Sequence, residues 1–188
     1  MAFRYEVRLS GSGGQGLILI GKILAEAAAI YDRLNATQSQ SYGPEARGGA
    51  SRSEVIISDG DIDYPKAENL DILLALTQEA CDKYIVDLKP NGILLIDSQM
   101  VSRIPEGSYQ VVALPIIQTA VERIGKFMVA NIIALGIITQ LSTIVSTEAV
   151  RHAIRARVPR GTEEINMQAF QFGIDLASNW QAGQTDHS

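Results

Sequence analysis

The chain has 188 residues, of which 46% are hydrophobic and 20% are charged, a composition typical of one globular domain with a substantial core. Its formal net charge is −5 at pH 7. Nucleic-acid-binding proteins usually carry a basic patch, so no nucleic-acid partner is expected. Cys81 is the single cysteine, and His152 and His187 are the two histidines. With so few soft ligands, we expect neither a disulfide, nor a zinc site, nor an iron–sulfur cluster held by this chain alone.

Two segments bear on where the protein works. The first residues lead directly into a predicted strand that carries Arg4, Glu6 and Arg8, which leaves no room for the apolar core of a signal peptide. Residues 127–141 are apolar on most sides, but Asn131 interrupts a run that is already shorter than the ~20 residues needed to cross a bilayer. We therefore expect a cytoplasmic protein with no membrane partner.

A glycine-rich turn near the N-terminus is the feature around which the chain is organised. Residues 3–9 alternate apolar and polar side chains, as a strand does, and apolar residues recur every three or four positions from Leu17, as on one face of a helix. Between them lie Gly11, Ser12, Gly13, Gly14, Gln15 and Gly16. A glycine turn at a helix N-terminus is suited to an anion, because free N–H groups point at the ligand and the glycines allow close approach. The alternative is that the glycines serve only a tight turn and close helix packing.

The nicotinamide version of this motif requires an acidic residue about 20 residues beyond the glycines. Here residues 35–40 are polar but uncharged, and Asp32 comes too early. An NAD-dependent dehydrogenase is therefore disfavoured.

A second loop, at residues 38–49, is rich in Gly, Ser and Gln. Tyr42 precedes Gly43–Pro44, and Gly48–Gly49 marks another turn. Glycine N–H groups beside the guanidinium of Arg47 form a suitable site for a carboxylate or phosphate. The alternative is a solvated loop in which Glu45 and Arg47 pair with each other or with a neighbour.

The rest of the chain alternates predicted strands and helices up to residue 114 and is helical afterwards. Residues 52–58 alternate polar and apolar, which predicts an edge strand with one solvated face, paired antiparallel. A short strand is expected at 34–37, and buried parallel strands are expected at 71–76, 93–96 and 109–114. A helix is expected at 79–88, and Pro90–Gly92 is its stop signal. Further helices are expected over 127–141, from Ser146 and from Thr162. The pattern predicts an α/β fold: a Rossmann-like, mostly parallel sheet with helices on both faces and a C-terminal helical segment. We expect residues 1–180 to form a single domain and 181–188 a disordered tail.

Several separated motifs together resemble one known family over nearly the whole chain. The motifs are Gly11–Gly16, Gln38–Gly49, Thr77–Ala80, Asn131 with Ala134–Gly136, and Asn166 with Ala169–Phe170. The second is the most specific. The chain resembles the gamma subunit of the 2-oxoacid:ferredoxin oxidoreductases, which implies a gamma-type domain and a part in an oxygen-sensitive, multi-subunit enzyme of anaerobic metabolism.

The resemblance implies a complex that converts a 2-oxoacid and coenzyme A to an acyl-CoA and carbon dioxide and passes the electrons to ferredoxin. It favours 2-oxoglutarate, followed by pyruvate or a branched-chain oxoacid. Alpha and beta subunits, with a ferredoxin-like delta subunit as a further candidate, would carry thiamine diphosphate and the iron–sulfur clusters. The alternatives are a stand-alone NAD(P)- or flavin-binding Rossmann protein and a non-catalytic assembly module.

We expect the loops that follow Gly11, Gln38, Thr77 and Asp97 to meet at the carboxyl ends of the strands, where open α/β sheets bind ligands. No catalytic or metal-binding residue is assigned. The candidate binding residues, including a contact to coenzyme A, are Gly11, Gly13, Gly14, Gln15, Gly16, Tyr42, Arg47, Gly48 and Gly49.

Overall fold

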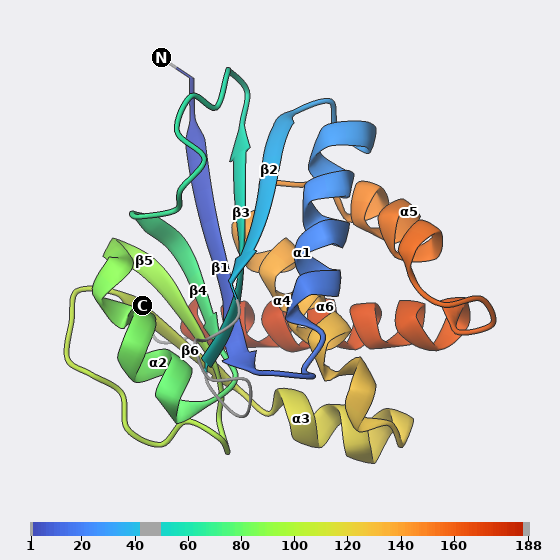
Figure 1. Ribbon diagram of the computed structural model, residues 1–188. Coiled ribbons are helices and arrows are strands. Elements are labelled where there is room, and N and C mark those ends of the chain that lie inside the picture. Colours follow the sequence, from blue (N-terminus) through green and yellow to red (C-terminus); the bar gives the residue numbers. More distant parts are fainter. Residues whose placement is uncertain (1, 42–49, 186–188) are drawn as a thin grey trace.

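A six-stranded sheet forms the centre of the protein in the computed structural model, which describes residues 2–41 and 50–185 (Figure 1). The strands are β1 (Arg4–Ser12), β2 (Asn35–Ser41), β3 (Ala50–Ser58), β4 (Leu70–Ala75), β5 (Leu88–Asp97) and β6 (Gln110–Leu114). Their order in the sheet is β2-β3-β1-β4-β5-β6. The run from β1 through β4 and β5 to β6 is parallel, whereas β3 pairs antiparallel with both β1 and β2.

Helices cover the two faces of the sheet unequally. They are α1 (Leu17–Glu26), α2 (Gln78–Tyr84), α3 (Ile116–Thr119), α4 (Ala130–Ser142), α5 (Thr147–Arg157) and α6 (Glu163–Thr185), with short helical turns η1 (Ala27–Tyr31), η2 (Ile85–Asp87), η3 (Ala120–Ile124) and η4 (Phe127–Val129). α1, α4, α5 and α6 share one apolar core with the sheet, and α2 belongs to the core on the other face. The predicted α/β class with its C-terminal helical segment is confirmed.

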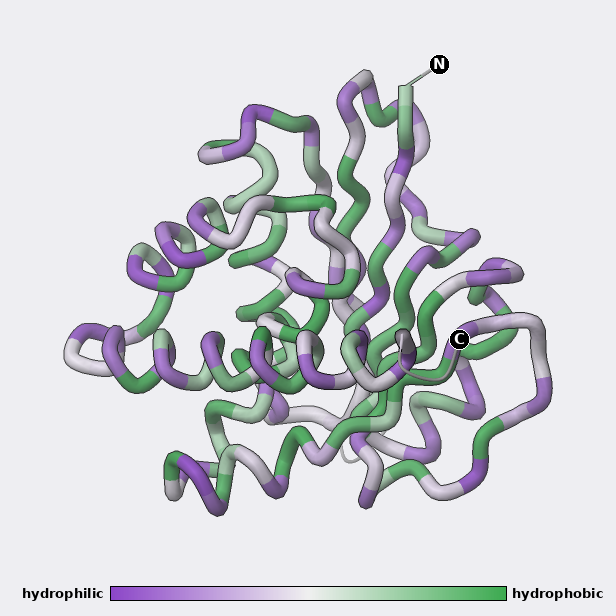
Figure 2. The backbone as a smooth tube through the Cα atoms, turned by 180° about the vertical axis from the view of Figure 1, so that it is seen from behind, coloured by the Kyte–Doolittle hydropathy of each residue, from purple (hydrophilic) through white to green (hydrophobic). Residues whose placement is uncertain are grey.

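The two cores follow from the alternation of side chains along the central strands. In β4, Ile72 and Leu74 belong to the core under α1 and α4, while Leu73 and Ala75 belong to the core under α2. Because both faces are covered, this strand is a continuous apolar run rather than an alternating one. Figure 2 shows such hydrophobic stretches where the strands meet the central helices, and hydrophilic segments along the outer helices.

The expectation for residues 52–58 is wrong in one respect, because β3 is an interior strand and both of its faces are mostly buried. Its antiparallel pairing is confirmed. The charged residue Glu54 tolerates burial because the Arg8 guanidinium of β1, itself 2% exposed, lies 2.8 Å from its carboxylate. The edge strand on this side of the sheet is instead β2, which extends past the predicted 34–37 to Ser41 and carries only uncharged side chains.

Two predicted boundaries also move. Helix α2 ends at Tyr84, and β5 begins at Leu88 and contains the Pro90–Gly92 stop signal. This signal produces an irregular strand instead of a loop: the pairing register with β4 jumps before Ile93, and Asn91 adopts a left-handed φ of 64°. The disordered tail expected from residue 181 does not begin there.

Helix α6 continues to Thr185, and Gln181 accepts a hydrogen bond of 3.1 Å from Gln140 of α4. The contact lies beyond the last buried residue of the helix, Ala177. Residues 186–188 lie outside the described part of the chain.

Two glycines allow α4 and α6 to cross in close contact. A Cβ atom added to Gly136 would overlap the carbonyl oxygen of Phe170, and one added to Gly173 would overlap the carbonyl oxygen of Ile133. Each glycine also lies 3.0 Å from the position that a Cβ of the other would take. Residues of the Ala134–Gly136 motif therefore serve the packing of the central helix against the last one.

We expect Gly173→Ala to destabilise the protein by about 1–3 kcal/mol, because the added methyl group overpacks a backbone contact that cannot move without separating two helices. Gly183→Ala is the matched control on the same helix, since its Cβ would meet open space. An alanine there should be neutral or stabilising by up to about 1 kcal/mol. Urea unfolding of both variants measures the difference, and equal midpoints would contradict the close crossing.

Cys81 is fully buried in the core under α2. Burial, and next the charge of Asp82, raise the pKa of its thiol to about 11 from an ordinary value of 9.0. Between about pH 9 and 11 the unfolded chain releases this proton while the folded chain keeps it, so folding stability falls as the pH rises. Two pKa units correspond to about 3 kcal/mol.

We therefore expect Cys81→Ala to lose less stability than the wild type when the pH is raised from 8.5 to 11, as measured by urea unfolding at each pH. Because tyrosines titrate in the same range, only the difference between the two proteins is informative. Parallel stability curves would show that the Cys81 thiol ionises equally in the folded and unfolded chains.

Candidate functional site

The glycine turn joins the end of β1 to the start of α1. Gly14 and Gly16 have φ angles of 84° and 73°, in the left-handed region that favours glycine. Gly16 is the N-cap of α1, and no side chain of the described residues caps this helix. The N–H groups of its first turn are thus left to solvent or to a ligand, which is the arrangement found at anion-binding helix N-termini.

Two amide side chains hold the turn from inside the protein. Gln15 folds back so that its Oε1 accepts a hydrogen bond of 2.8 Å from the Ser12 N–H, and it fills the space that a Cβ on Gly11 would need. Asn131, at the start of α4, donates from Nδ2 to the Gly16 carbonyl at 3.1 Å and fills the space beside that glycine. Gly11 and Gly16 are therefore enclosed by these two side chains, and Gly16 also has a positive φ that favours glycine.

Gly13 and Gly14 differ from these two glycines, because a Cβ added to either would meet no atom within 4 Å. Gly14 still needs glycine for its positive φ, but Gly13 has no such requirement. The open side of the turn is consequently formed by the backbone of these two residues. The turn was predictable from the sequence, but the role of Asn131 in it was not; the available signal was a buried amide in the first turn of an apolar helix.

Side chains in two of the loops expected at the carboxyl edge of the sheet make hydrogen bonds that stabilise the fold. Asp97, at the end of β5, is fully buried, and its carboxylate accepts hydrogen bonds from the N–H groups of Gln99, Met100 and Ile117 at 2.8–3.0 Å. The three bonds tie the ends of β5 and β6 together. They leave Asp97 committed to the fold.

Thr77 and Gln78 also stabilise this edge. Thr77 caps α2 by accepting a hydrogen bond of 3.2 Å from the Ala80 N–H. Gln78 accepts from the N–H groups of Ser102 and Arg103 and donates to the Arg103 carbonyl at 2.7 Å. Its hydrogen bond to Asp82, together with Arg103, lowers the pKa of that carboxylate. This motif fastens the long segment between β5 and β6.

Tyr42, Arg47, Gly48 and Gly49 lie outside the described residues. The residues on either side of this segment are placed by strand pairing: Ser41 is opposite Arg52, and Ala50 is opposite Ser12, the last residue of β1. The segment thus leaves β2 and enters β3 at the edge of the sheet where the glycine turn lies. The flanks of the two sequence motifs are neighbours in space.

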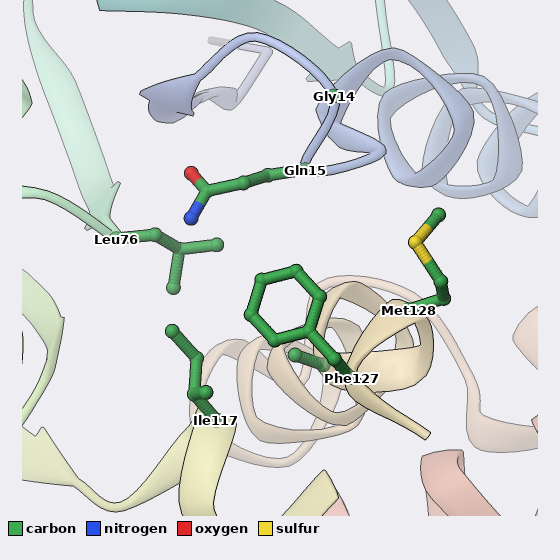
Figure 3. A pocket seen from close by; sticks show the side chains of 7 residues that line it. Gly14, Gln15, Leu76, Ile117, Phe127 and Met128 are labelled. Atoms are coloured by element: carbon green, nitrogen blue, oxygen red, sulfur yellow. The ribbon is translucent and has the colours of Figure 1, made fainter. Parts of the chain in front are cut away.

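Two hollows adjoin the turn. The first lies between Gln15 and Leu76 on one side and Ile117 and Phe127 on the other (Figure 3); at about 10 Å³ it holds about one water. The second is an apolar groove of about 340 Å³ that Gly16 lines. An organic ligand that contacts Gly13 and Gly14 must therefore lie mainly outside the first hollow.

The remaining chemistry of the described part is limited. The residues it describes contain no group of three or more His, Cys, Asp or Glu side chains arranged to hold a metal ion. Among these residues, too, no helix has both the length and the apolar character needed to cross a membrane.

Comparison with known proteins agrees with the motifs. Residues 6–176 match the family model of pyruvate ferredoxin/flavodoxin oxidoreductase. The chain is 52% identical to the 2-oxoglutarate synthase subunit KorC of Methanocaldococcus jannaschii, over 93% of this chain and 94% of that protein. It is 46% identical to KorC of Methanothermobacter marburgensis, over 95% of this chain and 99% of that protein.

A solved structure agrees as well. The gamma subunit of a keto/oxoacid ferredoxin oxidoreductase from Geobacter sulfurreducens is 56% identical and superposes with a TM-score of 0.85. The match covers 93% of this chain and 99% of that subunit. The resemblance drawn from the motifs is therefore confirmed. The chain belongs to the pyruvate ferredoxin/flavodoxin oxidoreductase family.

Proposed function

We propose that the protein is the gamma subunit of a 2-oxoglutarate:ferredoxin oxidoreductase. In this role it takes part in the oxidative decarboxylation of 2-oxoglutarate with coenzyme A, which yields an acyl-CoA, carbon dioxide and reduced ferredoxin. The observation that carries the proposal is the 46–52% identity to KorC subunits over more than nine-tenths of both chains. Identity at this level and coverage favours 2-oxoglutarate over pyruvate or a branched-chain oxoacid.

The chain's contribution is binding rather than redox chemistry. Its single cysteine is buried and its thiol pKa is raised, which does not suit a cluster ligand or a nucleophile. We assign thiamine diphosphate and the iron–sulfur clusters to partner subunits: alpha, beta and a ferredoxin-like delta subunit. This chain would supply a rigid glycine turn at the carboxyl edge of its sheet.

The turn is proposed to contact a phosphate of coenzyme A. Three observations support this: the uncapped N-terminus of α1, the open backbone at Gly13 and Gly14, and strand pairing that anchors both flanks of the Arg47 segment at the same edge. Oriented N–H groups and a guanidinium are the donors that phosphates prefer. Because the first hollow has room for about one water, the rest of coenzyme A would lie outside this chain, against a partner subunit.

The substrate is tested by purifying the native complex and comparing ferredoxin reduction with 2-oxoglutarate, pyruvate and 2-oxoisovalerate, each with coenzyme A. We expect kcat/KM to be highest for 2-oxoglutarate and the isolated chain to be inactive with all three. A preference for another oxoacid would overturn the substrate assignment. Tight binding of NAD(P)H by the isolated chain, measured by calorimetry, would instead support a dinucleotide-binding protein.

The coenzyme A contact is tested with Gly13→Ala and Arg47→Ala in the assembled complex. A Cβ on Gly13 meets nothing within the described chain, so the alanine should leave folding intact and obstruct only a ligand. Loss of a charged hydrogen bond from Arg47 costs about 1.5–3 kcal/mol, so the KM for coenzyme A should rise on the order of tenfold to a hundredfold.

The KM for the oxoacid serves as the internal control, and Gly183→Ala, which also adds a methyl group in open space, as the control variant. An unchanged KM for coenzyme A in both test variants would exclude the contact. Failure of the Arg47→Ala subunit to assemble would make Arg47 an interface residue instead.

A further inference from the structure

Large apolar side chains are exposed on consecutive turns beside the glycine turn. Val121 of η3 is 51% exposed, Phe127 of η4 is 48% exposed and Met128 of η4 is 67% exposed, and η3 and η4 are in contact. In Figure 3, Phe127 points toward Leu76 and Gln15, while Met128 stands on the other side of the same turn. Phe127 and Met128 also line one hollow together, and contiguous exposed apolar surface marks interaction sites in soluble proteins.

The apolar groove of about 340 Å³ continues this surface. It lies between η4, the start of α1 and the segment that joins α5 to α6, and Met128 lines both this groove and the first hollow. Most of its wall is formed by Leu19, Met128, Val129, Val158, Pro159 and Ile165. The groove, Phe127 and Met128 therefore form one apolar face, which we call the η4 face.

Lys126 is the single charged residue that lines the groove. No ion pair joins Lys126 to any residue in the described part of the chain. An apolar face that carries one unpaired cation is complementary to an apolar segment that carries a carboxylate, since opposite charges at an interface guide association and fix register.

We propose that the η4 face is a docking surface for a partner subunit, which inserts an apolar segment bearing an acidic side chain opposite Lys126. This inference rests on the proposed function only in requiring that partner subunits exist. A protein surface fits better than a small ligand, because the apolar area extends outside the groove to Phe127, where an enclosed ligand would not reach.

The position of this face gives the docking a consequence for the site. Gly16 lines the groove, and Gly14 and Gln15 line the hollow beside Phe127. A subunit seated on the η4 face therefore lies against the glycine turn. It covers the end of the sheet where the hollow beside Gln15 and Phe127 has room for about one water.

The test is to measure how tightly variants of the full chain bind the complex of the remaining subunits, prepared without gamma. Met128→Glu places a charge at the centre of the face, and we expect at least a tenfold increase in Kd. Lys126→Glu should weaken binding several-fold. Added salt should weaken the binding of the wild type but strengthen the binding of this variant. Val86→Glu is the matched control, because Val86 is 80% exposed but lies on η2, before the amino end of β5.

Circular dichroism melting shows whether each variant folds, and Lys126→Glu changes only a solvent-exposed side chain. Normal assembly of both Met128→Glu and Lys126→Glu would overturn the proposal. Normal assembly with a raised KM for coenzyme A would assign the groove to that molecule, and Met128-dependent dimers of the isolated chain would assign it to a second copy. Either result overturns partner docking. Because association is measured without turnover, it is independent of which oxoacid the complex uses.

Discussion

The hydrogen bond from the Asn131 amide to the Gly16 carbonyl is the contact on which the arrangement of the glycine turn depends. Asn131 is 5% exposed and begins a helix whose other buried residues are almost all apolar. A buried amide is stable there only if its polar atoms are paired. The contact therefore couples the position of α4 to the conformation of the turn. Since Gly136 and Gly173 set how closely α4 packs on α6, the C-terminal helix also takes part in holding the turn.

The parts of the fold that could be predicted from the sequence are those in which burial follows directly from residue type. The continuous apolar run of β4 indicates a strand covered on both faces, and Ser146 marks the start of α5, where its side chain accepts a hydrogen bond from the Ala149 N–H. β3 was misjudged because its polar residues suggest solvent, whereas Glu54 is buried with a partner on another strand. Such pairing at a distance along the chain leaves no local pattern.

The candidate site shows the same division. Strand, turn and helix could be located because glycine spacing and apolar periodicity are local. The roles of individual side chains could not be predicted. Gln15 faces inward and supports the backbone of the turn, and Gln78 holds the segment that follows β5. Both contacts depend on where other segments pass. The η4 face could not be located in the same way, because exposed and buried apolar residues look alike in a sequence. Residues 127–141 were expected to form one core or interface helix, but Phe127 and Met128 are exposed on a separate turn that precedes α4.

The buried pair of Arg8 and Glu54 lies in the middle of β1 and β3, yet it affects where the ends of these strands lie. The two residues lie directly opposite each other in the antiparallel pairing of β1 with β3. A slip of one residue would turn Glu54 toward the apolar face beneath α1 and leave the Arg8 charge without this partner, which is the costliest kind of register error. The pair thus fixes the register of β3 against β1 in the middle of the sheet. It determines that Ala50 arrives opposite Ser12, and so sets where the chain re-enters the sheet after residues 42–49, relative to the glycine turn.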